Sequence, residues 1–106
     1  MSQIIIVYSL QDGVSPSDVA FWVKSIDHPT MRGLARVKRF ETYQITGELI
    51  GDGAPSCQYI EIFDVPDLAG FTNQDLPGAT VQSIVGQFMG FVSAPEFLTA
   101  EAIGSS

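Results

Sequence analysis

The sequence predicts an α+β fold in which a four-stranded antiparallel sheet carries two helices, in the order βαββαβ. Three patterns lead to this fold class. Residues 3–10, 34–46 and 57–64 are β-branched or alternate between apolar and polar positions, as strands do. Two segments, starting at Ser15 and at Pro77, instead space their apolar residues three or four apart, as amphipathic helices do. A last apolar segment near the C-terminus supplies the fourth strand.

The first strand and the first helix have clear boundaries. Residues 3–10 form an apolar run of the kind found in strands buried on both faces, and Gln11-Asp12-Gly13 ends it. Ser15 is suited to the N-cap and Pro16 to the first helical position. We expect the helix to end at Asp27-His28-Pro29, because a residue before proline avoids helical geometry. Its apolar stripe consists of Val19, Trp22, Val23 and Ile26.

Two strands follow the first helix. Residues 34–46 predict a long strand that ends at Gly47, although Phe40 has the opposite parity from Val37. A bulge, or a change in which face is buried, would explain this irregularity. After a turn at residues 51–55, the segment 57–64 predicts a third strand. Its alternation places Tyr59, Glu61 and Phe63 on one face and Ile60 and Ile62 on the other.

The remaining chain completes the fold. A short helical turn or loop begins at residues 66–68, a helix follows from Pro77, and residues 97–103 form the last strand. The apolar positions of the second helix are Val81, Ile84, Val85, Phe88, Met89 and Val92. This order is the ferredoxin-like, or split βαβ, arrangement, and right-handed crossovers place the first and third strands in its centre. We expect residues 1–106 to form this single domain.

Two helices can cover only one face of such a sheet. We expect the other face to carry Tyr59, Glu61 and Phe63, which is too apolar a surface to leave in water. A second copy of the same sheet would cover it and could enclose a ligand between the two subunits. The sequence therefore predicts a homodimer of the dimeric α/β-barrel type.

Charge and cysteine content exclude several classes of protein. The net charge of −7 argues against binding to nucleic acid or to anionic membranes. Four of the five basic residues form one strip: Arg32, Arg36, Lys38 and Arg39. This strip could still steer an anionic small molecule, or it could pair with the protein's own carboxylates. The single Cys57 cannot form an intrachain disulfide. We see neither a signal peptide nor a membrane span, and we expect the protein to be cytoplasmic.

The sequence offers few groups for catalysis. It has no nucleotide-binding, serine-hydrolase or zinc-protease motif, so we expect no metal or cofactor. Any chemistry should be general acid–base catalysis or the positioning of a substrate that is itself reactive. Glu61 is the first candidate, because burial between aromatic rings raises the pKa of a carboxyl toward neutrality; an ion pair with the neighbouring strand is the alternative. His28 is the second, because a helix C-terminus stabilises imidazolium; it could equally be a surface residue that caps the helix.

Further residues are candidates for binding a substrate. Arg39, Glu41 and Tyr43 share one parity of the second strand and could hold a carboxylate or a carbonyl together. As a ladder of cross-strand contacts they would be purely structural. Tyr59 and Phe63, which flank Glu61, would supply the aromatic walls of a cavity.

Four segments together resemble the RedY-like (HapK) family of prodiginine pigment biosynthesis, within the dimeric α/β-barrel superfamily. They are residues 27–29, 36–43, 59–63 and 91–98. The resemblance implies a role in secondary metabolism, with a small aromatic or pyrrole-type substrate, and an activity like that of a cofactor-independent cyclase or isomerase. A protein that binds or carries a reactive intermediate, and a cofactor-independent monooxygenase, are the alternatives.

Overall fold

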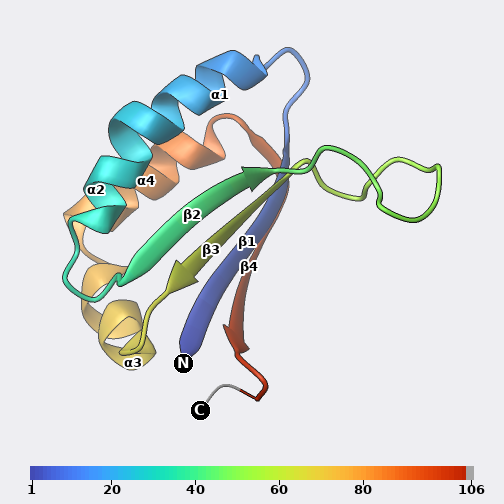
Figure 1. Ribbon diagram of the computed structural model, residues 1–106. Coiled ribbons are helices and arrows are strands. Elements are labelled where there is room, and N and C mark those ends of the chain that lie inside the picture. Colours follow the sequence, from blue (N-terminus) through green and yellow to red (C-terminus); the bar gives the residue numbers. More distant parts are fainter. Residues whose placement is uncertain (105–106) are drawn as a thin grey trace.

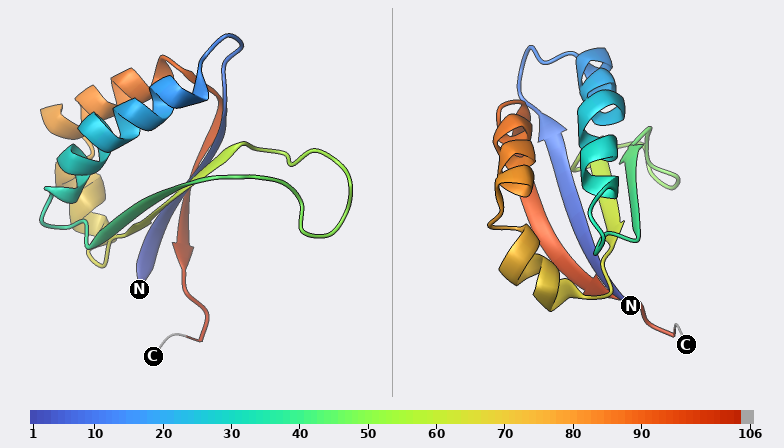
Figure 2. Two further views of the ribbon diagram at one scale, coloured as in Figure 1. Left: turned by 45° about the horizontal axis from the view of Figure 1, so that its top comes forward. Right: turned by 90° about the vertical axis from the view of Figure 1, so that its left-hand side faces the viewer.

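The computed structural model describes residues 1–104, so the last two residues of the predicted domain lie outside it. Its strands form one antiparallel sheet in the order β2-β3-β1-β4, with the helices on one face (Figures 1 and 2). This confirms the α+β class, with the first and third strands in the centre. The elements are β1 (Ser2–Leu10), α1 (Pro16–Trp22), a π-helical turn (Val23–Asp27), α2 (His28–Arg32), β2 (Arg39–Gln44), β3 (Tyr59–Asp64), α3 (Leu68–Gly70), a second π-helical turn (Phe71–Asp75), α4 (Ala79–Met89) and β4 (Val92–Glu101).

The first helix does not end at Asp27-His28-Pro29, so this prediction is wrong. α1 runs through the first π-helical turn into α2, and His28 donates its backbone N–H to the carbonyl of Val23, five residues earlier. Pro29 follows directly; it has no N–H to donate, and its ring would clash with the preceding turn of a regular α-helix. The wider π-helical turn accommodates the proline, and the helical run ends only at Gly33.

Two strands differ in length from the prediction. β2 begins at Arg39, and Val37 belongs to the turn before it, where its N–H bonds the carbonyl of Leu34. The parity of Phe40 therefore needs neither a bulge nor a change of face. β4 begins five residues earlier than predicted, at Val92, which was assigned to the helix. A register shift in β4 coincides with the positive φ of Ala94.

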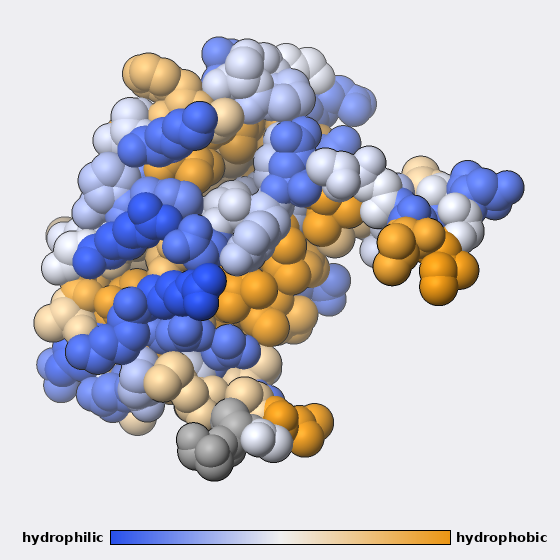
Figure 3. Space-filling view, in the orientation of Figure 1, coloured by the Kyte–Doolittle hydropathy of each residue, from blue (hydrophilic) through white to orange (hydrophobic). Residues whose placement is uncertain are grey.

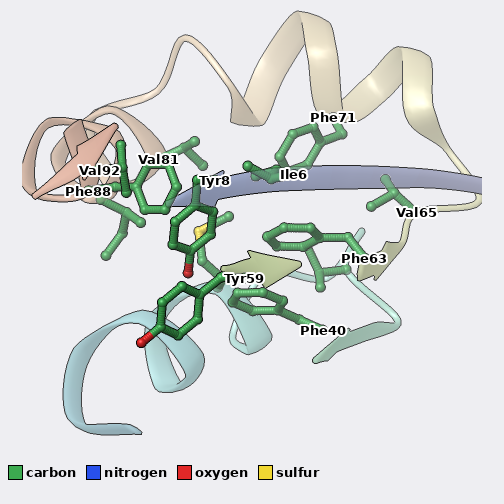
Figure 4. Close-up of a cluster of buried hydrophobic side chains, with 13 residues drawn as sticks. Ile6, Tyr8, Phe40, Tyr59, Phe63, Val65, Phe71, Val81, Phe88 and Val92 are labelled. Carbon is green, nitrogen blue, oxygen red and sulfur yellow. The ribbon is translucent and has the colours of Figure 1, made fainter. Parts of the chain in front are cut away.

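The aromatic side chains of β3 face the helices, so the predicted face for Tyr59, Glu61 and Phe63 is wrong. The Phe63 ring stacks on Phe40 with centroids 3.9 Å apart, and Tyr59 stacks on Tyr8. Figure 4 shows these rings gathered with side chains of α4 in one core. Strand alternation determines which residues share a face, but the face that the helices cover is decided by packing.

The opposite side of the sheet, which we call the helix-free face, is apolar in its middle. Strand pairing places there the half-buried Ile5, Val7, Ile60 and Ile62, with the more exposed Tyr43 and Leu98 beside them. Arg39 and Glu41 lie on the same face of β2 as Tyr43. No helix among residues 1–104 has the length and apolarity of a membrane span.

The segment between β2 and β3 projects from the body of the molecule (Figure 1). Leu49 and Ile50 lie in this segment and are 99% and 87% exposed. Figure 3 shows hydrophobic surface on this projection as well as on the body.

Candidate active site

A cavity of about 390 Å³ lies between the helix-covered face of the sheet and the helical segments α3 and α4. Its walls are mostly apolar, and Phe71 and Phe88 contribute aromatic rings opposite Phe63 of β3. The partly exposed side chains of Leu76, which precedes α4, and of Phe97 in β4 also line it, so the cavity reaches the surface beside these two residues. The polar side chains that line the cavity are Asp27, Glu61, Thr72, Gln82 and Thr99.

Glu61 is positioned by the centre of the sheet. It lies on β3 opposite Ile6 of β1, is 3% exposed, and accepts a hydrogen bond of 2.9 Å from the Tyr8 hydroxyl to Oε2. The pKa of Glu61 is raised to about 8, chiefly by burial and also by the nearby charge of Asp27, while the Tyr8 hydrogen bond acts in the opposite direction. The raised pKa that we predicted for a Glu61 enclosed by aromatic residues therefore arises, although helices of the same chain enclose it.

Asp27 is the second buried carboxyl in this cavity, and the sequence analysis missed it as a functional candidate. It is 2% exposed, and its Oδ2 atom has no hydrogen-bond partner within residues 1–104. The pKa of Asp27 is raised to about 7, because the effect of burial outweighs that of the positive charge of Arg32, which lowers it. An ionisable group with this burial and this perturbation, lining a cavity, is typical of a functional site.

The first π-helical turn aligns Asp27 with the buried side of its helix. Buried residues recur there at every fourth position: Val19, Val23, Asp27 and Met31. In a regular α-helix of 3.6 residues per turn, a spacing of four drifts steadily around the axis, and the wider π-helical turn reduces this drift. The sequence does contain a signal for this position, because Asp27 follows Val23 by four residues and so continues the apolar stripe of the helix. We had interpreted Asp27 as the end of that helix instead.

Glu61 and Asp27 line the same cavity, and we call them the carboxyl pair. With both pKa values raised to neutrality or above, the pair retains a proton near pH 7. One carboxyl can then donate a proton while the other accepts one, as in enzymes whose two carboxyls have different environments. The charge of Asp27 raises the pKa of Glu61, so the two titrations are linked.

His28 lies near this pair but does not line the cavity. Its Nε2 atom is 2.9 Å from the Thr42 hydroxyl oxygen, Thr42 pairs with Glu61 across β2 and β3, and the His28 ring packs edge-on against Phe40. Burial lowers the pKa of His28, and Arg32 lowers it further. The expected stabilisation of imidazolium at a helix end is therefore wrong, because the helix continues past this residue.

The predicted binding residues divide between the two faces. Tyr59 and Phe63 share the face of Glu61, and Phe63 lines the cavity. Arg39, Glu41 and Tyr43 lie on the helix-free face, so the structure does not bring them to Glu61.

Part of the basic strip is used within the chain. Arg36 contacts the carboxylates of Asp67 and Asp75, and Arg32 lies 3.3 Å from Glu41. For these two arginines, pairing with the protein's own carboxylates is the alternative that the structure supports.

The fold and the sequence have known relatives. The profile of the REDY-like protein HapK family matches residues 2–103. HapK from Hahella chejuensis superimposes with a TM-score of 0.80 at 27% identity, covering 100% of this chain and 96% of that one. None of the curated proteins matches this chain in sequence.

Two solved structures of lower identity share the fold. The hydroxynitrile lyase from Passiflora edulis has a TM-score of 0.80 at 10% identity, over 99% of this chain and 95% of that one. A dimeric ferredoxin-like protein from Thermobifida fusca has a TM-score of 0.70 at 14% identity, over 95% and 90%. These two structures show the fold alone. The profile match over nearly the whole length establishes the family: the chain belongs to the REDY-like HapK family.

Proposed function

We propose that this chain is a small enzyme of secondary metabolism that performs cofactor-free acid–base chemistry, of the cyclase or isomerase type, on an aromatic or pyrrole-type intermediate. One observation carries the proposal: two buried carboxyls, Glu61 and Asp27, face an apolar cavity with aromatic walls. Membership of the HapK family supports a place in the biosynthesis of prodigiosin-type bipyrroles.

The geometry supports a simple division of roles. The phenylalanine rings of the cavity bind a planar ring by apolar contact. The protonated carboxyl of the pair donates its proton to one atom of the substrate, and the ionised carboxyl removes a proton from another. Such a transfer rearranges the substrate without oxidation or reduction. Tyr8 holds the Glu61 carboxyl in place through its 2.9 Å hydrogen bond.

The test is metabolite profiling of a strain that lacks the gene, followed by complementation. The intermediate that accumulates names the substrate, and the purified protein should then convert it. Glu61→Gln and Asp27→Asn should each reduce turnover by about 100-fold or more, the scale of a lost general acid or base. Glu41→Gln, which alters a carboxylate on the helix-free face, is the matched control and should retain activity. Full activity in the Glu61→Gln, Asp27→Asn double variant would refute the assignment.

His28 remains the second predicted catalytic residue, and the same assay tests it. His28→Ala should reduce turnover less than Glu61→Gln does, because the imidazole does not line the cavity. A loss as large as that of Glu61→Gln would instead assign proton transfer to His28.

The alternative is a protein that binds or carries a reactive intermediate. The apolar, partly enclosed cavity favours this function as well, because it could shield a ligand from water. Saturable binding of the accumulated intermediate, without product, would identify it. Oxygen uptake coupled to product formation would instead indicate the remaining alternative, a cofactor-independent monooxygenase.

We also propose that the chain forms a homodimer through the helix-free face. Its middle is apolar, and the Thermobifida fusca protein of the same fold is described as dimeric. Glu61 lies on the other side of the sheet, so the dimer would support the cavity without enclosing this carboxyl between subunits.

A further inference from the structure

We propose that two copies of this chain pack their helix-free faces together with the strands crossing at nearly a right angle, so that Arg39 of each copy pairs with Glu96 of the other. The inference rests on the proposed homodimer, to which it adds the orientation of the subunits and the contacts that select it. It is independent of the cavity and of the carboxyl pair.

The apolar residues of the helix-free face form an oblique band, because the strand register shifts them from row to row. In the first row the residues on β2, β3 and β1 are apolar or aromatic, and only Glu96 on β4 is charged. In the second row the charged residue is Glu41 on β2, and the other three residues are apolar. In the third row only Ala100 on β4 is apolar, and Arg39 lies at the β2 end. The band therefore runs diagonally across the sheet, through Tyr43, Ile60, Val7, Ile62, Ile5 and Leu98.

Arg39 and Glu96 lie at the two corners beside this band. Both residues are exposed, and neither forms an ion pair within residues 1–104. The other charged residues in the three rows have partners, since Glu41 lies 3.3 Å from Arg32 and Asp64 accepts a 2.9 Å hydrogen bond from a side-chain amide of β1. One cation and one anion thus remain for a partner subunit, at opposite corners of the face.

A two-fold axis parallel or perpendicular to the strands would bury only the middle of the band. Because each band is oblique, such an axis lays the two bands across each other. The Tyr43 end of the band then faces a charged corner of the partner subunit instead of an apolar side chain. Burying a charge against an apolar surface is costly, so these arrangements are unfavourable.

An axis along a diagonal of the face buries the whole band. Three strand spacings and two row spacings each measure about 14 Å, so the face is nearly square and its diagonals are nearly perpendicular. Rotation about either diagonal lays one band along the other. In both cases the strands of the two sheets cross at close to a right angle, which is one of the two common packings of sheets.

Charge distinguishes the two diagonals. Rotation about the diagonal that follows the band exchanges the corners, so each Arg39 faces Glu96 of the partner subunit. Rotation about the other diagonal places Arg39 over Arg39 of the partner subunit, and Glu96 over Glu96 of the partner subunit. Like charges that face each other across an interface are strongly unfavourable, whereas complementary charges fix its orientation. The first arrangement is therefore selected, and its symmetry forms the ion pair twice.

Charge reversal tests the two ion pairs. Arg39→Glu and Glu96→Arg should each raise the dissociation constant of the dimer at least about tenfold, because each substitution creates two like-charge contacts. The Arg39→Glu, Glu96→Arg double variant should return this constant to within about threefold of the native value, because the reversed charges are again complementary. Sedimentation velocity over a dilution series measures the four dissociation constants.

Two matched controls carry the same changes of charge away from the corners. Lys38→Glu alters the exposed residue that precedes Arg39, and Asp12→Arg alters an exposed residue in the turn after β1. Both should keep the dissociation constant within about threefold of the native value. A loss of affinity in Glu96→Arg also differs from a net-charge effect, because this substitution reduces the negative charge of an acidic chain.

Cross-linking measures the orientation directly, and it serves as well if a charge-reversed variant does not fold. In a Cys57→Ser background, a short bismaleimide should link the subunits of the Arg39→Cys, Glu96→Cys double variant. The two single-cysteine variants should remain unlinked, because each cysteine would then face an unmodified corner of the partner subunit.

Three results would overturn the inference: single charge variants that dimerise as tightly as their controls, a double variant that does not recover, or efficient cross-linking of Arg39→Cys alone. Each of these results, with a native chain that dimerises, would leave the proposed homodimer standing. A monomeric native chain would refute the homodimer and this inference together.

Discussion

Glu61 and Asp27 are buried, which destabilises their charged forms. These two residues therefore make the free energy of unfolding depend on pH. In the unfolded chain both carboxyls lose their protons near pH 4. In the folded chain the pKa values rise to about 8 and about 7, so the folded state holds protons that the unfolded state has released. These two groups therefore lower the stability as the pH rises from about 4 to about 8.

This leads to a prediction about stability. The free energy of unfolding should fall between pH 5 and pH 8, and the Glu61→Gln, Asp27→Asn double variant should show a much flatter dependence. Each unit of pKa shift corresponds to about 1.4 kcal/mol, so the difference is large enough for urea denaturation to resolve. His28 acts in the opposite direction because its pKa is lowered; the slopes must therefore be compared between variants. An unchanged slope in the double variant would contradict the burial of the pair.

Tyr8 allows a second test at the same scale. Tyr8→Phe removes the hydroxyl that donates to Glu61 and keeps the ring that packs between Tyr59 and Phe88. Because this hydrogen bond lowers the pKa of Glu61, its loss should raise the pKa further. Carbon-13 NMR of the glutamate carboxyls measures the shift. Tyr59→Phe is the control, and an equal shift in both variants would show that the hydroxyl of Tyr8 is not the cause.

At the scale of elements, irregular helical turns form one end of the cavity. The first π-helical turn carries Asp27, and the second contributes Phe71 and Thr72. π-helical turns occur often at functional sites. In this chain the first one accommodates a proline that would otherwise interrupt the helix, and it keeps Asp27 directed toward the sheet.

Arg36 ties the second π-helical turn to the rest of the chain. From the turn before β2, its guanidinium contacts Asp67 at 3.2 Å, Asp75 at 3.3 Å and the side-chain oxygen of Gln74 at 2.9 Å. These contacts lie at the surface, so they add little to global stability. They do hold a wall of the cavity in place.

We therefore expect Arg36→Ala to speed hydrogen–deuterium exchange across residues 68–75 while leaving exchange in β1 and β3 nearly unchanged. Lys38→Ala removes a neighbouring exposed charge and should change neither region. Exchange measured by mass spectrometry distinguishes the two variants. Uniformly faster exchange in Arg36→Ala would mean that this residue supports the whole fold instead of one wall.

At the scale of the whole molecule, the two faces of the sheet differ in what covers them. The helix-covered face holds the aromatic core and the cavity. The helix-free face presents Ile60 and Ile62 near its centre, where a second sheet would bury them. A change there should alter assembly before it alters the cavity.

Ile62→Lys tests this division. The native chain should sediment at twice its monomer mass at micromolar concentration, and the variant should sediment as a monomer, because an unpaired lysine in an apolar interface is costly. Leu49→Lys, on the projecting segment, is the control and should remain dimeric. A monomeric native chain would refute the proposed dimer while leaving the cavity and its carboxyl pair in place.

Some features of this protein follow from its sequence alone. Residue periodicity predicted the α+β class and the order of elements along the chain, because the period of two or of 3.6 is a local property of each segment. The handedness of crossovers then placed the first and third strands in the centre of the sheet. The same periodicity grouped Tyr59, Glu61 and Phe63 on one face, and the aromatic neighbours of Glu61 suggested its raised pKa.

Other features depended on the tertiary structure. Which face the helices cover is decided by packing between segments far apart in sequence, and alternation is symmetric with respect to that choice. The buried position of Asp27 depended on a helix continuing through Pro29, which local preferences argue against. Glu61 and Asp27 line one cavity only because β3 and the first helical run meet there, and no local pattern in either segment predicts that contact.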